Sequence, residues 1–370
     1  MLDFHGIVFA YRTAPALGEL VSYRTAASLP FCGRYRLIDF SLSSLMNAGI
    51  RDVGVIMQRD YQSLLDHLGS GKPWDMSRKS RGLRILPPFG LPEYHKGDYA
   101  GTMEALNAVA AYVRDIPQQH VVLLLGDLAA NIDLSPILEQ HLRVGAPITA
   151  ICSEHTPRSA RNRYVADENG FVKSARYDVQ GEGEGYASLE GYVIEKQTLL
   201  SMMARADERN EYRFHRGGID DYLAGGGKMA LAIHRGYAEI IRSVDDYYSA
   251  SRDMLAPAKR REMFPQERPV RTKSQEGVST YYGENASVSG SLVADNCIIE
   301  GELKDCILFS GVRVGKGAKL ENCILFRDTV VGDGARLNAV IADKRCKIAP
   351  DTVLIGSEKL PIVIGKGKSL

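Results

Sequence analysis

The sequence of 370 residues contains no run of about 18 apolar residues, and it therefore predicts no membrane-spanning helix. Residues 1–20 carry Asp3 and His5 but no basic leader followed by an apolar core, so no signal peptide is expected. The net charge is only +1, which does not favour binding to nucleic acid or to a membrane surface. A cytoplasmic protein without a membrane or nucleic-acid partner is expected.

No two of the six cysteines form a C-x-x-C pair, which argues against a zinc site and against a disulfide framework. Reduced thiols that pack among apolar side chains are expected instead. The cysteines are Cys32, Cys152, Cys297, Cys306, Cys323 and Cys346.

What the first part of the sequence does contain is an alternation of strand-like and helix-like segments. Continuous apolar runs predict strands buried on both faces of a mainly parallel sheet. They lie at 6–10, 52–58, 120–127 and 147–152. Helices are predicted between them, at 39–50, 61–71, 101–116 and 135–145. This order predicts an α/β, Rossmann-like fold whose ligand lies beyond the carboxyl ends of the strands.

The composition and the periodicity of the sequence change near residue 256. Residues 256–280 contain prolines and basic residues without periodicity, which is typical of a linker on the surface. We therefore expect one domain at 1–255, a linker at 256–280 and a second domain at 281–370.

The second domain contains a repeat. VGKGA begins at Val314, VGDGA at Val331 and IAPDT at Ile348, in two steps of 17 residues. Aliphatic and small residues at intervals of about six indicate a left-handed parallel β-helix, whose coils bury their apolar side chains by stacking. Three hexads make about 18 residues, so one corner of each coil is expected to be one residue shorter.

Two strand ends in the first domain are candidates for chemistry. VVLLLGD ends in Asp127, where a carboxylate either holds Mg²⁺ between phosphates or caps a turn, and the local sequence does not decide between them. A first strand of this kind usually leads into a glycine-rich phosphate turn, but no glycine follows before Gly18. Asp133 is expected to cap the next helix.

Three segments together resemble the ADP-glucose pyrophosphorylases (glucose-1-phosphate adenylyltransferases). They are RTAASLPFCGRYRLIDFSLSSLMNAGIRDVGVI at 24–56, GTMEA at 101–105 and LLLGD at 123–127. The resemblance covers essentially the whole chain and implies a nucleotidyltransferase (GT-A-like) domain followed by a left-handed β-helix. It also implies tetramers that make ADP-glucose from ATP and glucose 1-phosphate. Phosphorylated metabolites regulate that family at the cleft between its two domains.

The family's phosphate loop, G-G-x-G-T-R-L, matches residues 11–17 here, and all three glycines are replaced. Pro15 has no backbone N–H, and the arginine of the loop has become Ala16. The lysine of the A-K-P motif that follows is Ala26. Arg12 is not expected to make up for the lost charge. This loop is therefore expected not to hold a triphosphate.

The metal site departs from the family pattern as well. The family's second metal-binding aspartate falls on Ile240, which leaves Asp127 as a vestigial ligand. Glu239 or Asp245 would replace it only through a slip in register. No stable metal ion is expected.

The substrate side is altered in the same way. The lysine that holds glucose 1-phosphate in the family falls on Tyr177. Ser188 matches a serine of the substrate site, but the glycine near it is Glu190, and the arginine of the base-binding loop is Ala100. The residues that persist on the nucleotide side are Tyr99, Gly101 and Thr102.

These departures resemble the GlgD-type, regulatory and non-catalytic subunit of the family. That resemblance implies little or no activity of the chain alone, no cofactor of its own, and Mg²⁺ in a catalytic partner. The partner is expected to be a catalytic subunit in a hetero-tetramer, or the same chain in a homo-oligomer. Arg24 and Arg36 match effector-site positions, and each is either a ligand of a phosphorylated metabolite or a structural arginine.

Three other functions stay open at this point. One is an active adenylyltransferase with altered loops, and another is a sensor without a partner enzyme. The third is a hexapeptide-repeat acyltransferase, which needs a catalytic histidine near the repeats. It is disfavoured because all eight histidines precede them, the last being His234.

Overall fold

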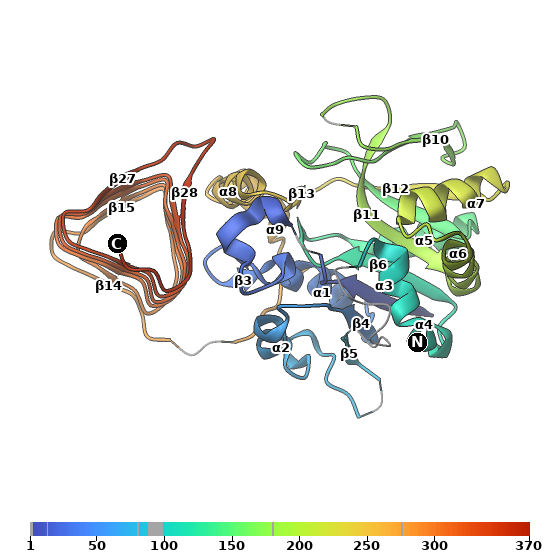
Figure 1. Ribbon diagram of the computed structural model, residues 1–370, viewed down its shortest axis with the longest axis horizontal. Helices are drawn as coiled ribbons and strands as arrows, with labels where there is room; N and C mark the ends of the chain where they lie inside the picture. Colours follow the sequence, from blue (N-terminus) through green and yellow to red (C-terminus); the bar gives the residue numbers. More distant parts are fainter. Residues whose placement is uncertain (1–2, 13, 80, 88–98, 180, 275–276) are drawn as a thin grey trace.

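The computed structural model describes residues 3–12, 14–79, 81–87, 99–179, 181–274 and 277–370. Figure 1 shows two parts side by side, an α/β domain and a triangular coil of strands. The N-terminus lies on the α/β domain and the C-terminus lies within the triangular outline of the coil.

The α/β domain is built on a nine-stranded sheet. Its strands are β1 (Phe4–Phe9), β4 (Val53–Ile56), β5 (Leu83–Leu86), β6 (His120–Leu125), β8 (Ile148–Ser153), β9 (Arg163–Ala166), β10 (Val172–Arg176), β11 (Tyr186–Glu195) and β12 (Met229–His234). The order is β10-β9-β11-β6-β1-β4-β5, with β8 beside β11 and β12 beside β8. Strands β6, β1, β4 and β5 are parallel, whereas β11 is antiparallel to β6 and β8. The mainly parallel, Rossmann-like sheet is confirmed.

The strands predicted at 6–10, 52–58, 120–127 and 147–152 are β1, β4, β6 and β8. The helices are α1 (Leu37–Asn47), α2 (Gln62–Leu68), α3 (Thr102–Ala108), α4 (Ala110–Asp115), α5 (Leu134–Val144), α6 (Lys196–Arg209), α7 (Asp221–Ala224), α8 (Val244–Asp253) and α9 (Pro257–Met263). The helix predicted at 101–116 is divided into α3 and α4 at Val109, whose backbone is not helical. None of the described helices combines the length and the apolar character that crossing a membrane requires.

Shorter strands and helices lie in the segments that connect the main elements of this domain. They are β2 (Pro30–Phe31), β3 (Tyr35–Arg36), β7 (Leu128–Ala130), β13 (Ala238–Ile240), the 3₁₀ helices η1 (Pro15–Val21), η2 (Ala26–Ser28) and η3 (Lys72–Trp74), and the π-helix η4 (Phe214–Asp220). The small sheet β13-β7 pairs Ile240 with Leu128, the residue after Asp127.

The C-terminal part consists of three parallel sheets of five strands each. The first contains β14 (Tyr281–Tyr282), β17 (Ile298–Ile299), β20 (Arg313–Val314), β23 (Val330–Val331) and β26 (Lys347–Ile348). The second contains β15 (Ser287–Ser289), β18 (Glu302–Lys304), β21 (Lys319–Glu321), β24 (Arg336–Asn338) and β27 (Val353–Ile355). The third contains β16 (Leu292–Val293), β19 (Ile307–Leu308), β22 (Ile324–Leu325), β25 (Val340–Ala342) and β28 (Ile362–Ile364). This is the left-handed β-helix that the repeat predicts.

The repeat also gives the register of the coils. Val314 pairs with Val331, and Val331 pairs with Ile348, so the step of 17 residues is one turn of the β-helix. Cys297, Cys306, Cys323 and Cys346 point into the coil and belong to its apolar core. All six cysteines are free thiols in the described chain, as the spacing predicts.

The expectation that residues 256–280 lie over the surface without periodicity is wrong for the first part of this segment. Pro257 begins α9, and Met263 at the end of this helix is fully buried. The Asn131 side chain then donates hydrogen bonds to the carbonyl oxygens of Met263 (3.1 Å) and Arg268 (2.8 Å). Proline at the first helical turn favours this helix because its missing N–H has no partner there in any case. The domain boundaries themselves stay predictions.

An apolar core lies between the two parts. It joins Leu17 and Leu20 of η1 and Tyr247 of α8 to Ile324 and Phe326 of the β-helix. Figure 1 shows α8 next to the β-helix, and the Tyr248 hydroxyl donates a hydrogen bond of 2.8 Å to the Asn322 carbonyl oxygen.

Candidate functional site

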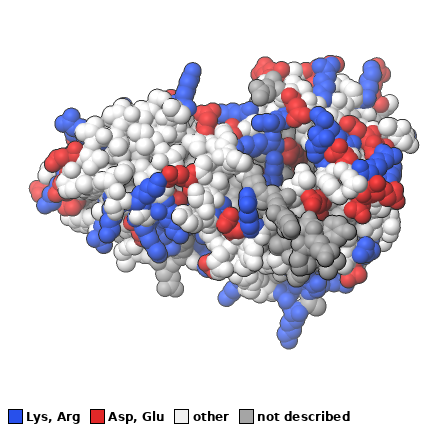
Figure 2. All heavy atoms as spheres, in the orientation of Figure 1, with Lys and Arg blue, Asp and Glu red and all other residues white. Residues whose placement is uncertain are grey.

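The carboxyl ends of the central strands meet at one edge of the sheet. Phe9, the last residue of β1, pairs with Ile56 of β4 and with Leu125 of β6. A cavity of about 380 Å³ opens at this edge, as expected for a parallel α/β sheet. Figure 2 shows a hollow in the α/β domain with both basic and acidic side chains around it.

The segment after β1 fills space at this edge. The Tyr11 hydroxyl donates a hydrogen bond of 3.3 Å to the Thr102 hydroxyl, and its ring contacts the Tyr99 ring edge-on at 5.1 Å. Pro15 begins η1, and Leu17 is buried in the core between the two parts. Thr13 lies outside the described residues. The segment therefore places the aromatic ring of Tyr11 at a position that the resemblance aligns with a glycine of the phosphate loop.

Asp127 and Ile240 lie together at the position where the resemblance predicts a metal site. Both side chains are buried, and the Ile241 amide donates a hydrogen bond of 3.0 Å to the Asp127 carbonyl oxygen. Burial raises the pKa of the Asp127 carboxyl, an effect that Arg12 and Arg242 oppose. A hard cation needs several oxygen ligands, and the side chain of Ile240 offers none. The residues at this position do not fit Mg²⁺.

Glu239 does not replace the missing ligand. Its carboxylate accepts hydrogen bonds from the Arg158 guanidinium (2.7 Å) and the Arg158 amide (2.8 Å). Burial raises the pKa of Glu239 to about 7 against the opposing effect of Arg158. Among the described residues, no group of three or more His, Cys, Asp or Glu side chains is placed to hold a metal ion.

The strongest polar cluster in the cavity is centred on Glu190. One carboxylate oxygen lies 3.3 Å from the Arg12 guanidinium, and the other forms an ion pair with Arg242. The Arg12 guanidinium also lies 3.8 Å from Asp127. Arg12 was not expected to replace the lost positive charge, and its guanidinium is shared between two carboxylates of the chain itself. Arg242 was missed in the sequence, which gives no local sign of its role.

The substrate-side residues are occupied by internal contacts. The Ser188 hydroxyl accepts a hydrogen bond of 3.0 Å from the Glu190 amide, and Ser188 is buried. The Tyr177 hydroxyl donates a hydrogen bond of 2.6 Å to Asp220, and its ring lies 4.9 Å from the His215 ring. Tyr177 is therefore tied to η4.

The nucleotide-side residues Tyr99, Gly101 and Thr102 all line the cavity, together with Ala100. Packing alone requires glycine at position 101, because a Cβ there would lie 2.1 Å from the Tyr212 carbonyl oxygen. Asp133 stands at the N-cap of α5 but makes no capping hydrogen bond; its carboxylate pairs with Arg268 at 3.0 Å.

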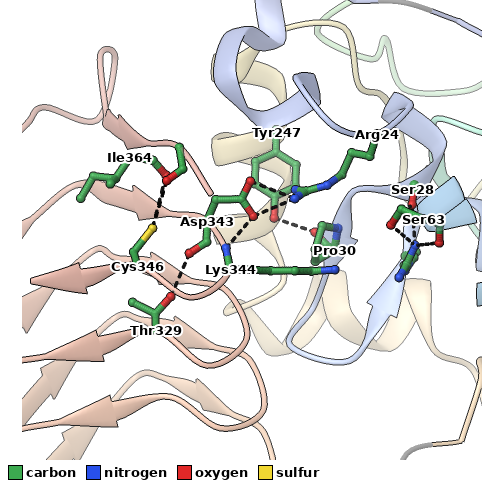
Figure 3. A network of polar contacts seen from close by, with 12 residues as sticks. Arg24, Ser28, Pro30, Ser63, Tyr247, Thr329, Asp343, Lys344, Cys346 and Ile364 are labelled. Atoms are coloured by element: carbon green, nitrogen blue, oxygen red, sulfur yellow. Dashed lines mark hydrogen bonds and ion pairs between the residues drawn. The ribbon is translucent and has the colours of Figure 1, made fainter. Parts of the chain in front are cut away.

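Arg24, the first of the two effector candidates, lies at the junction of the two parts (Figure 3). Arg24 donates hydrogen bonds of 2.9 Å to both carboxylate oxygens of Asp343 in the β-helix, and both side chains are buried. Arg36 donates to the Ser28 hydroxyl and to the Ser63 carbonyl oxygen, each at 2.5 Å. The sequence left open whether Arg24 binds a phosphorylated metabolite or has a structural role. These contacts describe the structural role.

Arg36 lines a second cavity, of about 350 Å³, between the two parts. Arg34, Arg327 and Lys344 line it too, and Figure 2 shows blue side chains gathered where the β-helix meets the α/β domain. Burial, reinforced by the charges of Arg36 and Arg24, lowers the pKa of Lys344 to about 7.

Comparison with known proteins agrees with both parts of the fold. Residues 19–174 match the nucleotidyl transferase family model, and residues 276–360 match the GlmU-like, C-terminal hexapeptide model. The first match includes β4, β6 and Asp127 of the sheet edge described above, whereas β1, Glu190 and Ile240 lie outside it. The α/β domain is thus that of a nucleotidyltransferase-type protein.

Full-length relatives define the family more closely. The chain is 36% identical over 356 residues to the glycogen biosynthesis protein GlgD of Bacillus subtilis, covering 95% of this chain and 92% of the relative. It is 33% identical over 389 residues to GlgD of Geobacillus stearothermophilus, covering 98% and 96% of the two chains. It is 30% identical over 307 residues to a glucose-1-phosphate adenylyltransferase of Clostridium botulinum, covering 81% and 78%. The chain belongs to the ADP-glucose pyrophosphorylase family, and within it to the GlgD type.

Proposed function

We propose that the chain is a regulatory, catalytically impaired subunit of glucose-1-phosphate adenylyltransferase in bacterial glycogen synthesis. The observation that supports this most directly is the pairing of β13 with β7, which sets the buried Ile240 beside Asp127. A carboxylate is needed there to complete an Mg²⁺ site between phosphates.

The rest of the cavity supports the same proposal. Tyr11 stands in place of a phosphate-binding backbone, and Tyr177 stands in place of a lysine and is tied to Asp220. Loss of one charge-stabilising group often costs 10² to 10³ in rate. Several such losses in one site leave little catalysis for a lone chain.

The partner in this proposal is a catalytic subunit of the same family, with Mg²⁺ held in that subunit. The regulatory contribution would come from assembly and from a phosphorylated metabolite in the cavity between the two parts. Arg34, Arg36, Arg327 and Lys344 supply positive charge there, and Asp295 is the acidic side chain among its described lining residues. Guanidinium and ammonium groups suit phosphate oxygens.

The test is pyrophosphorolysis of ADP-glucose by the purified chain, alone and mixed with a catalytic subunit, with and without a sugar bisphosphate. We expect no turnover above background from the lone chain and a changed rate or effector response in the mixture. Turnover by the lone chain near that of a catalytic subunit would instead support an active enzyme with altered loops. Failure to co-purify with a catalytic subunit, and no effect on its rate, would leave a sensor without a partner enzyme.

A further inference from the structure

Glu190 has an unusual backbone for a glutamate. Its φ is +53°, in the left-handed region that favours glycine. It lies in β11 where the register with β8 shifts between Ser188 and Gly191, so the strand bulges at this residue. A side chain at such a position is strained, and strained residues persist where the surrounding structure fixes them.

The bulge directs the Glu190 side chain into the cavity. The carboxylate lies between the guanidinium groups of Arg12, at 3.3 Å, and Arg242. The Asn162 side-chain amide is 3.5 Å from the oxygen that contacts Arg242. These partners come from three separate segments, after β1, after β13 and before β9. Two guanidinium groups and an amide around one anion make the arrangement that proteins use for phosphate.

The two arginines are themselves held in place. The Arg242 guanidinium donates a hydrogen bond of 3.1 Å to the Ser159 carbonyl oxygen, and its amide donates one of 3.1 Å to Asp246. The Arg12 guanidinium lies between Glu190 and Asp127. Burial acts to raise the pKa of Glu190, but Arg12 and Arg242 outweigh it and hold the pKa below its usual value. The carboxylate is therefore charged at neutral pH.

We propose that the Glu190 carboxylate is an internal anion that occupies a phosphate-binding site formed by Arg12 and Arg242 and keeps external phosphate groups out of it. This deepens the proposed function, on which it rests. On this proposal, phosphate binding in the cavity is prevented by an added negative charge as well as by the loss of ligands. Because the arginines remain, removing the carboxylate should uncover the site.

The test measures binding of inorganic pyrophosphate, without metal, by isothermal titration calorimetry at fixed ionic strength. We expect Glu190→Gly to bind at least tenfold more tightly than the wild type, since it removes both the charge and the strained side chain. Glu190→Gln keeps the size of the side chain and removes only the charge. It should show a smaller gain.

Two controls separate this site from other cationic surfaces. Glu321→Gln makes the same change in net charge on the β-helix, where Glu321 pairs with Lys304 at 2.6 Å, and should leave pyrophosphate binding unchanged. Adding Arg242→Gln to Glu190→Gly should abolish the gain. A gain that survives in this double variant, or that also appears in Glu321→Gln, would contradict the proposal.

Thermal unfolding of each variant shows whether it is folded. If Glu190→Gly does not fold, Glu190→Gln still decides the matter. Binding by folded Glu190 variants no tighter than that of the wild type would overturn the internal anion but leave the proposed function standing. Turnover by the wild-type chain alone would overturn the proposed function. Pyrophosphate binding by the Glu190 variants would still decide, independently, whether Glu190 is an internal anion.

Discussion

At the scale of single residues, position 240 shows how one side chain decides what a site can hold. The backbone there is ordered, because β13 pairs with β7 and the Ile241 amide donates a hydrogen bond to the Asp127 carbonyl oxygen. The resemblance to the family aligns a metal-binding aspartate with this position. Ile240 is fully buried and belongs to the core of the α/β domain, so it stabilises the fold where a carboxylate would bind metal.

Replacing Ile240 with aspartate is therefore expected to restore no activity. Tyr11 would still occupy the place of the phosphate loop, and the new carboxylate would be buried close to Asp127. We expect the free energy of unfolding to fall by at least about 3 kcal/mol. Pyrophosphorolysis with Mg²⁺ and thermal unfolding measure the two effects.

The matched control is Ile240→Val, which removes one methylene and should cost about 1 kcal/mol. Substantial turnover by Ile240→Asp alone would contradict the view that the loop after β1 cannot hold a triphosphate.

At the scale of secondary-structure elements, histidines connect neighbouring elements in the domain core. His141 of α5 forms hydrogen bonds with the Thr149 hydroxyl of β8 at 2.8 Å and with the His120 ring of β6 at 3.1 Å. Burial, with a smaller effect of His120, lowers the pKa of His141 to about 4. The neutral imidazole is therefore what holds these elements together.

This predicts a loss of stability in acid. Below the ordinary histidine pKa of about 6.5 the unfolded chain binds a proton at His141, whereas the folded chain does not until about pH 4. Stability should fall by about 1.4 kcal/mol per pH unit across this window for this one group. Urea unfolding from pH 7 to pH 4 should show a shallower fall in His141→Gln. The exposed His155→Gln serves as control, and an equal slope in wild type and His141→Gln would contradict the prediction.

In the β-helix, the repeat predicts the length of most coils but not of all of them. The step of 17 residues holds from Ile307 to Ile324 and from Ile324 to Ile341. The first coil keeps the step of 17, because Tyr281 pairs with Ile298, but the second is shorter, because Ile298 pairs with Arg313. The last coil is longer, because Val340 pairs with Ile362. The last coil has a neighbour on one side only, so it is free to depart from the repeat.

At the scale of the whole molecule, the two parts are joined by a shared core and by a buried ion pair. The Arg24 guanidinium faces the Asp343 carboxylate across the junction (Figure 3). The guanidinium carbon also lies 5.9 Å from the centre of the Phe326 ring. A buried pair gains little over apolar residues, but breaking it leaves an unpaired buried charge.

Arg24→Met should therefore lower the free energy of unfolding by about 3 to 5 kcal/mol. Asp343→Asn alone should also destabilise, and the double variant should lose less than the two single losses together. Urea unfolding of all four proteins measures this coupling. The exposed Arg345→Met is the control, and strictly additive losses would contradict the coupling.

The cavity between the two parts should respond to pH through Lys344. The groups around it are Arg24, Arg34, Arg36, Arg327, Lys366, His67, Asp295 and Asp343. An anion prefers the ammonium form of Lys344, which is lost as pH rises through about 7. Sulfate is a suitable probe because its own charge does not change over this range. Its affinity should fall about tenfold between pH 6 and pH 8.5 as Lys344 loses its charge. This corresponds to about 1.4 kcal/mol, the size of one charge-assisted contact.

Calorimetric titration with sulfate at each pH measures the effect. Lys344→Gln should bind sulfate weakly with a flat pH profile. A profile in Lys344→Gln that still falls with pH would contradict the assignment of the effect to Lys344.

Much of the fold follows from local patterns. Apolar runs gave the strands β1, β4, β6 and β8, and the repeat gave the β-helix, because buried strands and stacked coils need apolar side chains at fixed intervals. The segment 256–280 was misjudged at α9, where seven residues are too few to show helical periodicity. The departures from the family pattern at Ile240 and Tyr177 were also visible in the sequence, since each concerns the type of one residue at one position.

The sequence by itself thus determined the two kinds of architecture and the residue types at the positions where the family pattern differs. Only the tertiary structure decided what took their place. Glu190 meets Arg12 from 178 residues away, and Arg24 meets Asp343 from 319 residues away. A sequence pattern records which face of an element a side chain occupies, but its distant partner is chosen by how the elements pack. That packing turned two arginines of a ligand cavity toward a carboxylate of the same chain.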